Sequence, residues 1–388
     1  MKFLIGILVF FMLLSGCSKY TQETNTIQCS FSGSINNSYS KKDTIEKLMH
    51  NYMQQGIPGL VIAIYTPSSG YWGSAMGFAK IETQTPMELC HLQYLQSISK
   101  TYLATLILKL HEEGKINLDD PITKYLPEKF IKYIDNANTM SVRNLLNHTS
   151  GMPDYLESPS YITFVLQHPY HFFTSDEFLS YIENKKQQFT PGSKFEYSNT
   201  NYHVLALIAD SLGGNHDDLI RQKILSPLGL YNSFYRNIKG NHNLVNSYMD
   251  RFSTGIVENV SQLQQESISC AKGDDGIIAT PFDAINFLKS LMEGNILSDS
   301  SLAQMKTWVN DEHGNPIYGL GLYHVMFSGI EGYGHGGAGA GAASGLYYFP
   351  EKNIYVFLGT NIGTLVDGPI VEKVIELKLK VLDLILHD

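Results

Sequence analysis

The pattern of apolar and polar positions predicts that the folded body opens with a helix followed by two strands. Apolar residues recur at helical spacing over 45–53, and Gly56 and Pro58 then end that helix. The continuous apolar run Leu60–Tyr65 predicts a strand that is buried on both faces. A turn leads from it to a second predicted strand, Tyr71–Ala79.

The C-terminal part mirrors this arrangement. The stretches "GLGLYHVMF", "AASGLYYF" and "IYVFLGTN" predict three strands, and a helix from about Pro369 to Leu386 closes the chain. Between the two ends the sequence is mostly helical and rich in loops. We therefore predict an α/β (α+β) domain over 43–388, in which 43–113 and 298–388 form the α/β part and 114–297 is an inserted helical region. Sites in such folds lie where the two parts meet.

The first residues predict export and lipid anchoring. The apolar run Phe3–Leu14 is shorter than the roughly 20 residues of a membrane-spanning helix, so 1–16 is predicted to be a signal peptide. It ends in "LSGC", which resembles a bacterial lipobox, so Cys17 is the predicted lipidation site. Ser18 resembles an outer-membrane address, which places the protein at the outer membrane, facing the periplasm. The alternative is ordinary cleavage that leaves a soluble protein. Residues 17–42 are polar and predict a flexible tether.

Composition and charge narrow the class of partner. The net charge of -9, without a basic stripe, excludes a nucleic-acid binder, because phosphate contacts need a basic face. The sequence has no H-E-x-x-H and no Cys or His pair at zinc spacing, so we predict neither a metal nor a cofactor. Cys29, Cys90 and Cys270 allow one disulfide and one free thiol, with the pairing left open.

The first motif with catalytic potential is S-x-x-K at Ser97–Lys100. It precedes a strong apolar helix, whose first turn would bring the hydroxyl and the amine together and whose N–H groups favour an anion. A partly desolvated lysine can act as the base that activates the hydroxyl. The same pattern occurs at Ser38–Lys41, in the predicted tether, and at Ser269–Lys272. A helix-capping serine beside a surface lysine is the simpler alternative.

Two further motifs follow in the chain. Tyr197 and Asn199 form a Y-x-N before another apolar helix, where a phenol could relay protons and an amide could hold the lysine or a substrate carbonyl. Tyr235–Asn237 repeats this pattern, and a packed tyrosine with a capping asparagine is the alternative. The triplet His335–Gly337 lies in a Gly/Ala run just before a predicted strand, where a ligand can approach the backbone closely.

In this order, the three motifs resemble those of the serine β-lactamase-related family, which includes class C β-lactamases, D-alanyl-D-alanine carboxypeptidases, D-aminopeptidases and esterases. The resemblance runs from about Ile45 to the end and includes "SVRNLLNHTSGMPDY" and "PGSKFEYSN". It implies a β-lactamase-like antiparallel sheet flanked by the terminal helices.

The resemblance also implies roles for the motif residues. Ser97 is the expected nucleophile, Lys100 its base and Tyr197 the proton relay. The substrate-binding residues implied are Asn199, His335, Gly337 and Ala338, with the Ala338 N–H completing an oxyanion hole. His148 in "NHTSG" is expected to brace the cleft floor.

Two positions depart from the family pattern. Gln96 stands where glycine commonly precedes the serine, and Gly336 replaces a hydroxyl residue of the third motif. Enzymes of this kind that hydrolyse β-lactams well usually hold the substrate carboxylate with a cation and a hydroxyl in that motif. Here His335 is the only candidate cation and is largely neutral at neutral pH.

The sequence therefore predicts a serine hydrolase that forms an acyl-enzyme on Ser97. We expect a cell-envelope enzyme of the D-alanyl-D-alanine carboxypeptidase or D-amino-acid peptidase type, with weak β-lactamase activity and a peptidoglycan stem peptide as a candidate substrate. Alternatives are a small-ester esterase on the same fold and a catalytically idle cell-wall-binding lipoprotein. The absence of G-x-S-x-G argues against an α/β-hydrolase.

Overall fold

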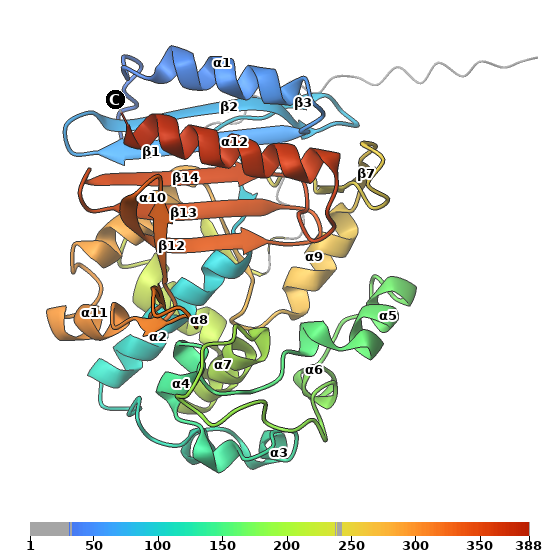
Figure 1. The fold of residues 1–388 in the computed structure, drawn as a ribbon, viewed down its shortest axis with the longest axis vertical. Helices are drawn as coiled ribbons and strands as arrows, with labels where there is room; N and C mark the ends of the chain where they lie inside the picture. Colours follow the sequence, from blue (N-terminus) through green and yellow to red (C-terminus); the bar gives the residue numbers. More distant parts are fainter. Residues whose placement is uncertain (1–30, 32, 237, 239–242, 388) are drawn as a thin grey trace, which may run out of the picture.

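The computed structural model describes residues 31, 33–236, 238 and 243–387. Its centre is a nine-stranded antiparallel sheet with the strand order β3-β2-β1-β14-β13-β12-β11-β10-β9 (Figure 1). N-terminal and C-terminal strands meet in the middle of this sheet, where β1 pairs with β14 along its length. The strands are β1 Gly59–Thr66, β2 Gly70–Lys80, β3 Thr85–Pro86, β9 Val309–Asn310, β10 Pro316–Tyr318, β11 Tyr323–Phe327, β12 Ile330–Ala338, β13 Ala343–Phe349 and β14 Ile354–Thr360.

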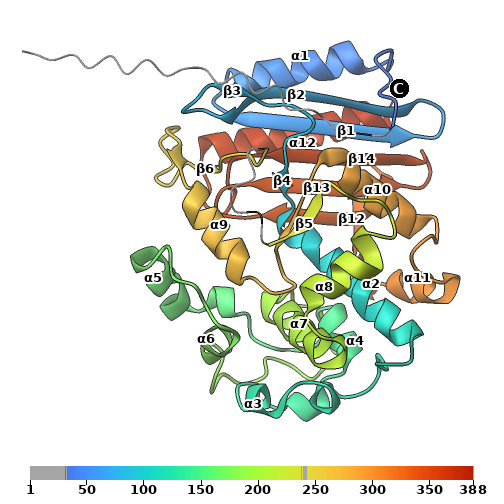
Figure 2. The ribbon, with the colours of Figure 1, turned by 180° about the vertical axis from the view of Figure 1, so that it is seen from behind.

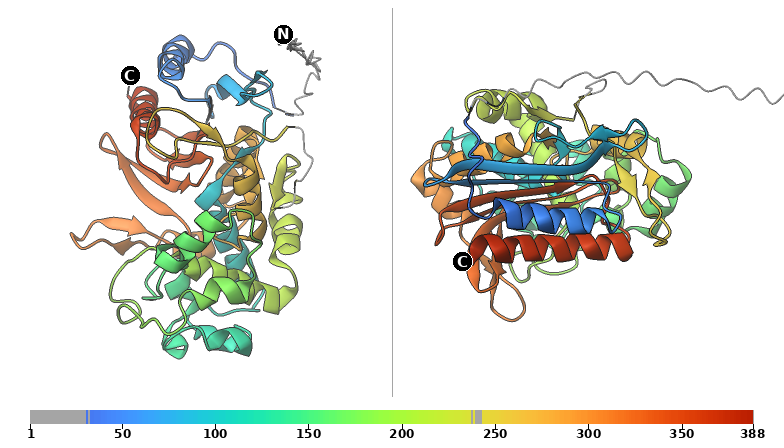
Figure 3. Two further views of the ribbon diagram at one scale, coloured as in Figure 1. Left: turned by 90° about the vertical axis from the view of Figure 1, so that its right-hand side faces the viewer. Right: turned by 90° about the horizontal axis from the view of Figure 1, so that it is seen from above.

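The two terminal helices cover one face of the sheet. α1 (Lys42–Met53) and α12 (Pro369–Leu386) lie side by side on it (Figure 3, right). Their apolar stripes pack on the strand residues that point to that side, such as Ile62 and Val356. Both predicted helices and the β-lactamase-like fold class are confirmed.

The opposite face of the sheet rests on the larger core of the molecule. α10 (Pro281–Met292), which belongs by sequence to the predicted helical insertion, contacts β1, β13 and β14 there (Figure 2). α2 (Ser99–Glu112) and α7 (Asn199–Gly213) pack against each other below it. The remaining helices are α3 Glu128–Ile131, α4 Val142–Leu146, α5 Pro159–Gln167, α6 Ser175–Ser180, α8 His216–Ile220, α9 Ser261–Cys270 and α11 Asp299–Met305.

Five short strands lie outside the large sheet. β4 (Gln93–Tyr94), β8 (Ile277–Ala279) and β5 (Ser233–Tyr235) form one small sheet, and β6 (Tyr248–Met249) pairs with β7 (Glu258–Asn259). β4 leads directly into the Ser97 motif, and β8 follows a pair of aspartates. The β4–β8 pairing therefore brings these two segments together.

The strand β12, which carries the third motif, was not expected from the sequence. The third motif was predicted to precede a strand, but His335–Ala338 forms the end of β12 itself and pairs with β13 through Ala338 and Ala343. Glycine weakens strands, and this strand carries four glycines, at 332, 334, 336 and 337, so the pattern gave no strand signal. β11 pairs with β12 only as far as Gly334. The edge of β12 that carries the motif is therefore open on that side.

The last residues of the predicted tether lie against the folded body. Ile35 forms a bridge with Tyr71, the ring of Tyr39 stacks on Trp72 at 5.1 Å, and Lys41 Nζ donates to the last carbonyls of α12. The predicted lipidation site, Cys17, lies outside the described residues. In the described part of the chain, no helix combines the length and the apolar character needed to cross a bilayer.

The states of the cysteines agree with the one disulfide and one free thiol that the sequence allowed. Cys90 is disulfide-bonded, whereas Cys270 is a buried free thiol.

Candidate active site

Ser97 lies in a short 3-10 helix, Gln96–Ile98, that runs directly into α2. Lys100 follows one turn later and is fully buried, yet its ammonium group has three acceptors. Nζ donates to Ser97 Oγ at 3.0 Å, to Asn199 Oδ1 at 2.9 Å and to the Asp274 carbonyl at 2.8 Å. The first two predicted motifs therefore meet at one amine, which links the hydroxyl to the helical region.

Burial sets the proton affinity of this amine. Desolvation lowers the pKa of Lys100 to about 8, while the carboxylates of Asp274, Asp275 and Asp154 act in the opposite direction. Because the ammonium and the carboxylates share one buried site, desolvation also raises the pKa values of Asp274 and Asp275. A lysine with this pKa is mostly protonated at pH 7, but its neutral fraction is far larger than that of an exposed lysine. It can accept a proton from a neighbouring hydroxyl.

Asp154 fixes the orientation of Asn199. Its Oδ2 accepts from the backbone N–H of Asn199 at 3.0 Å and from Nδ2 at 2.7 Å. With Nδ2 engaged in this way, Oδ1 is the amide atom that faces Lys100. The carboxylate thus holds the amide so that it accepts from the ammonium.

Tyr197 lies next to both members of the first motif. Lys100 Nζ is 5.0 Å from the centroid of its ring. Burial raises the pKa of Tyr197, and a hydrogen bond with Ser97 offsets part of that rise. The phenol is consequently protonated at neutral pH, so it can donate a proton but is a poor resting base.

His148 supports this tyrosine from below. It is fully buried, and its ring lies 4.3 Å from the Tyr197 ring and 4.8 Å from the Tyr318 ring, centroid to centroid. Its Nδ1 accepts from the Ser198 backbone N–H at 3.2 Å. Desolvation holds the pKa of His148 well below its usual range. These contacts fit the bracing role expected from the sequence.

His335 is a neutral residue in this site. It is 2% exposed, and desolvation together with the nearby Lys100 charge lowers its pKa to about 3. Nδ1 donates to the Gly336 carbonyl at 2.5 Å, so in the neutral ring Nε2 accepts from the Tyr318 hydroxyl at 2.9 Å. The third motif therefore presents no cation to a substrate.

Gly337 brings the strand edge against the nucleophile segment. A Cβ at this position would lie 2.4 Å from the Leu95 carbonyl oxygen, 2.7 Å from Gln96 Cβ and 3.2 Å from the Ser97 nitrogen. Only glycine permits this approach of two backbones. The end of β12 is thus held next to the Ser97 backbone N–H, where the oxyanion hole was predicted.

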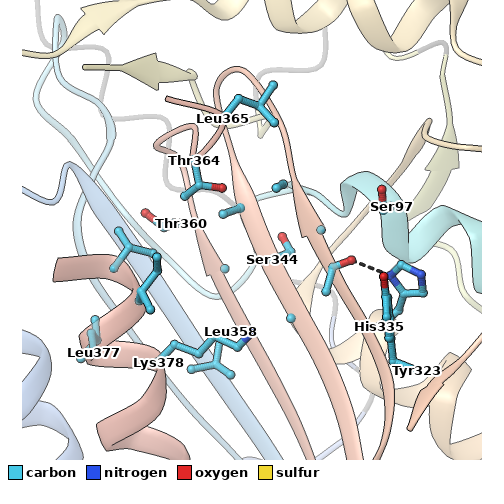
Figure 4. Close-up of a pocket in the computed structure, with 18 of the residues that line it drawn as sticks. Ser97, Tyr323, His335, Ser344, Leu358, Thr360, Thr364, Leu365, Leu377 and Lys378 are labelled. Carbon is cyan, nitrogen blue, oxygen red and sulfur yellow. Dashed lines mark hydrogen bonds between the residues drawn. The ribbon is translucent and has the colours of Figure 1, made fainter. Parts of the chain in front are cut away.

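A cavity of about 550 Å³ opens at Ser97. It contains Tyr197, Asn199, His335, Gly337 and Ala338, and it continues over the sheet toward α12 (Figure 4). Every predicted catalytic and substrate-binding residue except Lys100 lines it, and Lys100 lies directly beneath Ser97. Within the described residues, no group of three or more His, Cys, Asp or Glu side chains is arranged to hold a metal ion.

The decoy motifs have other partners. Ser269 Oγ donates to the Glu266 carbonyl, and Lys272 pairs with Asp210 at 3.6 Å. Lys41 caps α12 rather than contacting Ser38.

The tyrosine of the repeated Y-x-N is also engaged elsewhere, and Asn237 lies outside the described residues. The Tyr235 hydroxyl accepts from the Gly273 N–H and contacts His216.

Several residues of the site were not expected from the sequence. Asp154 orients Asn199, Asp274 and Asp275 lie beside Lys100, and Tyr318 bonds to His335. Asp154 stands in the quoted stretch "SGMPDY", and the aspartate pair in "KGDDG". Two adjacent acidic residues before a buried strand are a weak signal, because most such pairs are solvated surface charges.

The chain belongs to the Beta-lactamase family, whose sequence profile matches residues 42–378. It is 28% identical over 232 residues to a Bacillus subtilis protein named as a penicillin-binding protein, PbpX, covering 59% of this chain and 53% of that one. It is also 28% identical to Protein flp of Staphylococcus aureus, covering 57% and 43% of the two chains. The chain thus spans about half the length of the curated relatives it matches.

Solved structures match a larger share of this chain than the curated relatives do. A D-stereospecific amidohydrolase from Streptomyces is 26% identical with a TM-score of 0.74, covering 86% of this chain and 97% of that one. The D-amino acid amidase of Ochrobactrum anthropi complexed with L-phenylalanine amide is 25% identical with a TM-score of 0.77, covering 89% and 99%. A penicillin-binding protein from Bacillus halodurans, at 22% identity and a TM-score of 0.71, covering 86% and 98%, shares the fold. The family profile and the solved structures thus agree on the family and the fold of this chain.

Proposed function

We propose that the protein hydrolyses small D-amino-acid amides or peptides in the bacterial cell envelope through an acyl-enzyme on Ser97. The observation that carries the proposal is the buried Lys100 ammonium, bonded to both Ser97 Oγ and Asn199 Oδ1. The similarity to a D-stereospecific amidohydrolase and a D-amino acid amidase supports this substrate class. A D-alanyl-D-alanine carboxypeptidase acting on peptidoglycan stem peptides is the cell-wall form of the same activity.

The chemistry follows from the positions of the groups. Neutral Lys100 takes the proton of Ser97 as Oγ attacks the substrate carbonyl carbon. The resulting oxyanion accepts hydrogen bonds from the N–H groups of Ser97 and Ala338. As the intermediate collapses, Tyr197 gives its proton to the departing amine and recovers one from Lys100. Water then attacks the acyl ester by the reverse route, which frees the acid and Ser97.

Weak β-lactamase activity is part of the proposal. A β-lactam carboxylate needs a cation and a hydroxyl near position 336, but His335 is neutral and Gly336 has no side chain. Losing a charge-assisted hydrogen bond of this kind costs about 1.5–3 kcal/mol, which corresponds to tenfold or more in kcat/KM. A small-ester esterase is the second candidate, because the space beside Gly336, which has no side chain, also suits an uncharged acyl group.

A panel of four substrates tests the proposal: a D-alanyl-D-alanine peptide, a D-amino-acid amide, p-nitrophenyl acetate and a chromogenic cephalosporin. We expect the peptide or the amide to have a higher kcat/KM than the cephalosporin, and the cephalosporin to have the lowest value in the panel. Cephalosporin turnover above every other substrate would contradict the proposal.

The variant Gly336→Ser tests the physical reason. It should raise cephalosporin kcat/KM relative to the peptide by about tenfold, the value of one restored hydrogen bond to a charged group. Gly336→Ala is the matched control without the hydroxyl. An equal effect of both variants would show that the missing hydroxyl does not set the selectivity.

A further inference from the structure

The cavity at Ser97 is longer than the predicted site requires. Beyond Gly336 it crosses the outer face of β13 and β14 and passes beneath α12, where Leu358, Val374 and Ile375 line it. Ser97 and Lys378 lie at separate ends of this region, with β12 and β13 between them (Figure 4). We call this extension the α12 groove: Gly336, Gly345, Leu358, Val374, Ile375 and Lys378.

Missing side chains make the floor of the α12 groove. Gly336 faces Gly345 across the β12–β13 pair, and Gly345 faces Leu358 on β14. A Cβ on Gly336 would meet one hydroxyl, that of Tyr347, at 3.2 Å. A Cβ on Gly345 would lie 2.7 Å from Tyr347 Cε2, so the Tyr347 ring covers this glycine and forms part of the floor. The floor is therefore open at Gly336, and Leu358, Val374 and Ile375 make the walls mostly apolar.

The far end of the α12 groove carries an ammonium group, that of Lys378, with no carboxylate partner among the described residues. Lys378 Nζ donates to the Tyr347 hydroxyl at 2.8 Å and lies 4.9 Å from the centroid of that ring. Its neighbours on α12, Lys373 and Lys380, both pair with Glu376. Lys378 forms no such pair with a described residue, and it is only partly exposed. A half-buried ammonium over an apolar floor is stabilised by an anion.

We infer that the α12 groove binds an extended apolar chain of the substrate that ends in an anionic group, with Lys378 and the Tyr347 hydroxyl holding the anion. This inference rests on the proposed reaction at Ser97, and it adds the chemical class of the substrate chain that extends away from the reacting carbonyl. The anion lies at the far end of a chain and not beside the reacting carbonyl. It therefore differs from the carboxylate that a β-lactam would present at position 336.

Two series of esters test the chain and show which side of the ester bond carries it. One series varies the acyl chain, with p-nitrophenyl acetate, hexanoate and octanoate. The other varies the alcohol, with acetate esters of ethanol, hexanol and octanol. We expect kcat/KM to rise by about tenfold or more from the shortest to the longest member of one series, because each buried methylene strengthens binding. No rise in either series, with the acetates still hydrolysed through Ser97, would overturn this inference alone. Absence of any Ser97-dependent turnover would overturn the proposed function itself.

Substitutions on α12 test the location. Ile375→Trp should fill the groove and remove the chain-length dependence in whichever series shows it. Leu379→Trp is the matched control, because Leu379 is equally exposed on the same helix (51% against 50%) and does not line the cavity. The same loss in both variants would contradict the placement of the chain.

The charge is tested with esters from the series that shows the dependence on chain length. At the preferred length, the chain carries either a terminal carboxylate or its methyl ester. The wild type should prefer the carboxylate by about tenfold. Lys378→Gln should abolish that preference and keep the preference for a long chain, whereas Lys380→Gln should change neither. A carboxylate preference that survives Lys378→Gln, or none in the wild type, would overturn the assignment of Lys378.

Discussion

Lys100 is a buried ammonium group whose environment balances two opposite effects on its pKa. Desolvation favours the neutral amine, and the carboxylates of Asp274, Asp275 and Asp154 favour the ammonium. The result is a pKa of about 8, well below that of an exposed lysine. Tyr197 differs, because its raised pKa keeps it protonated. The residue that loses its proton first is therefore Lys100.

This difference predicts the pH dependence of the reaction. Below pH 8 Lys100 is mostly protonated and cannot accept the Ser97 proton, so kcat/KM for an uncharged ester should rise with pH and level off above about 8. A pH–rate profile from pH 5.5 to 10 measures this. Lys100→Arg should lose both the activity and the pH-dependent rise, because a guanidinium does not deprotonate. A profile that is flat through this range would show that Lys100 is not the base.

The backbone conformation of Gln96 shows why glycine commonly precedes the serine in this family. Its φ is +52°, in the left-handed region, where a residue with a Cβ costs about 1–2 kcal/mol. The buried Gln96 side chain also lies against Gly339. The chain therefore tolerates this backbone geometry without the residue best suited to it.

At the scale of the elements, β12 packs directly against the 3-10 helix Gln96–Ile98, and Gly337 sets their distance. An alanine there would place its Cβ 2.4 Å from the Leu95 carbonyl oxygen, so one of the two segments must move. Overpacking of this kind costs about 1–3 kcal/mol. The movement would also shift the backbone N–H groups of Ser97 and Ala338 relative to each other.

Gly337→Ala should therefore lower the thermal midpoint and reduce kcat by about 100-fold, the cost of a misplacement of about 1 Å in an active site. Gly336→Ala is the control, because its Cβ would approach no atom more closely than the Tyr347 hydroxyl at 3.2 Å, so the thermal midpoint should stay near that of the wild type. Both quantities come from thermal unfolding and ester hydrolysis of the purified variants. Equal effects of the two substitutions would contradict this account of Gly337.

The sequence predicts those elements whose apolar pattern is strong. α12 begins and ends where its pattern does, β1 extends the predicted run by one residue at each end, and β14 ends one residue before its predicted end. β12 was missed because its glycines are there for close approach and carry no strand signal. The motif residues were predictable because each has a recognisable spacing. Asp154, Asp274 and the Tyr347–Lys378 pair were not, because their partners are far away in sequence and only the folded chain brings them together.

At the scale of the whole molecule, the site lies between parts of the chain that are distant in sequence. Ser97 comes from the segment after β4, Asn199 from the start of α7, and His335 from β12. The family profile spans these segments as one unit, from residue 42 to residue 378. The groups that act on the substrate thus depend on the sheet and the helical region folding together.

The envelope location is a prediction about the whole molecule that rests on its first residues. Cys17→Ser removes the predicted lipid attachment site and should move the protein from the membrane fraction to the soluble envelope fraction. Fractionation followed by immunoblotting measures this, and Cys270→Ser is a matched control, because Cys270 is a buried free thiol in the folded body. A Cys17→Ser variant that still fractionates with membranes would place the anchor elsewhere.

The central claim is that Ser97 carries the acyl group, and intact-mass analysis with an acylating probe tests it most directly. A fluorescent penicillin or a fluorophosphonate, incubated with the protein and followed by peptide mapping, should add one label at Ser97. Ser38→Ala and Ser269→Ala should label like the wild type, and Ser97→Ala should not label and should lose turnover by about 10⁴-fold or more. Label on Ser38 or Ser269, or label that persists in Ser97→Ala, would contradict the account.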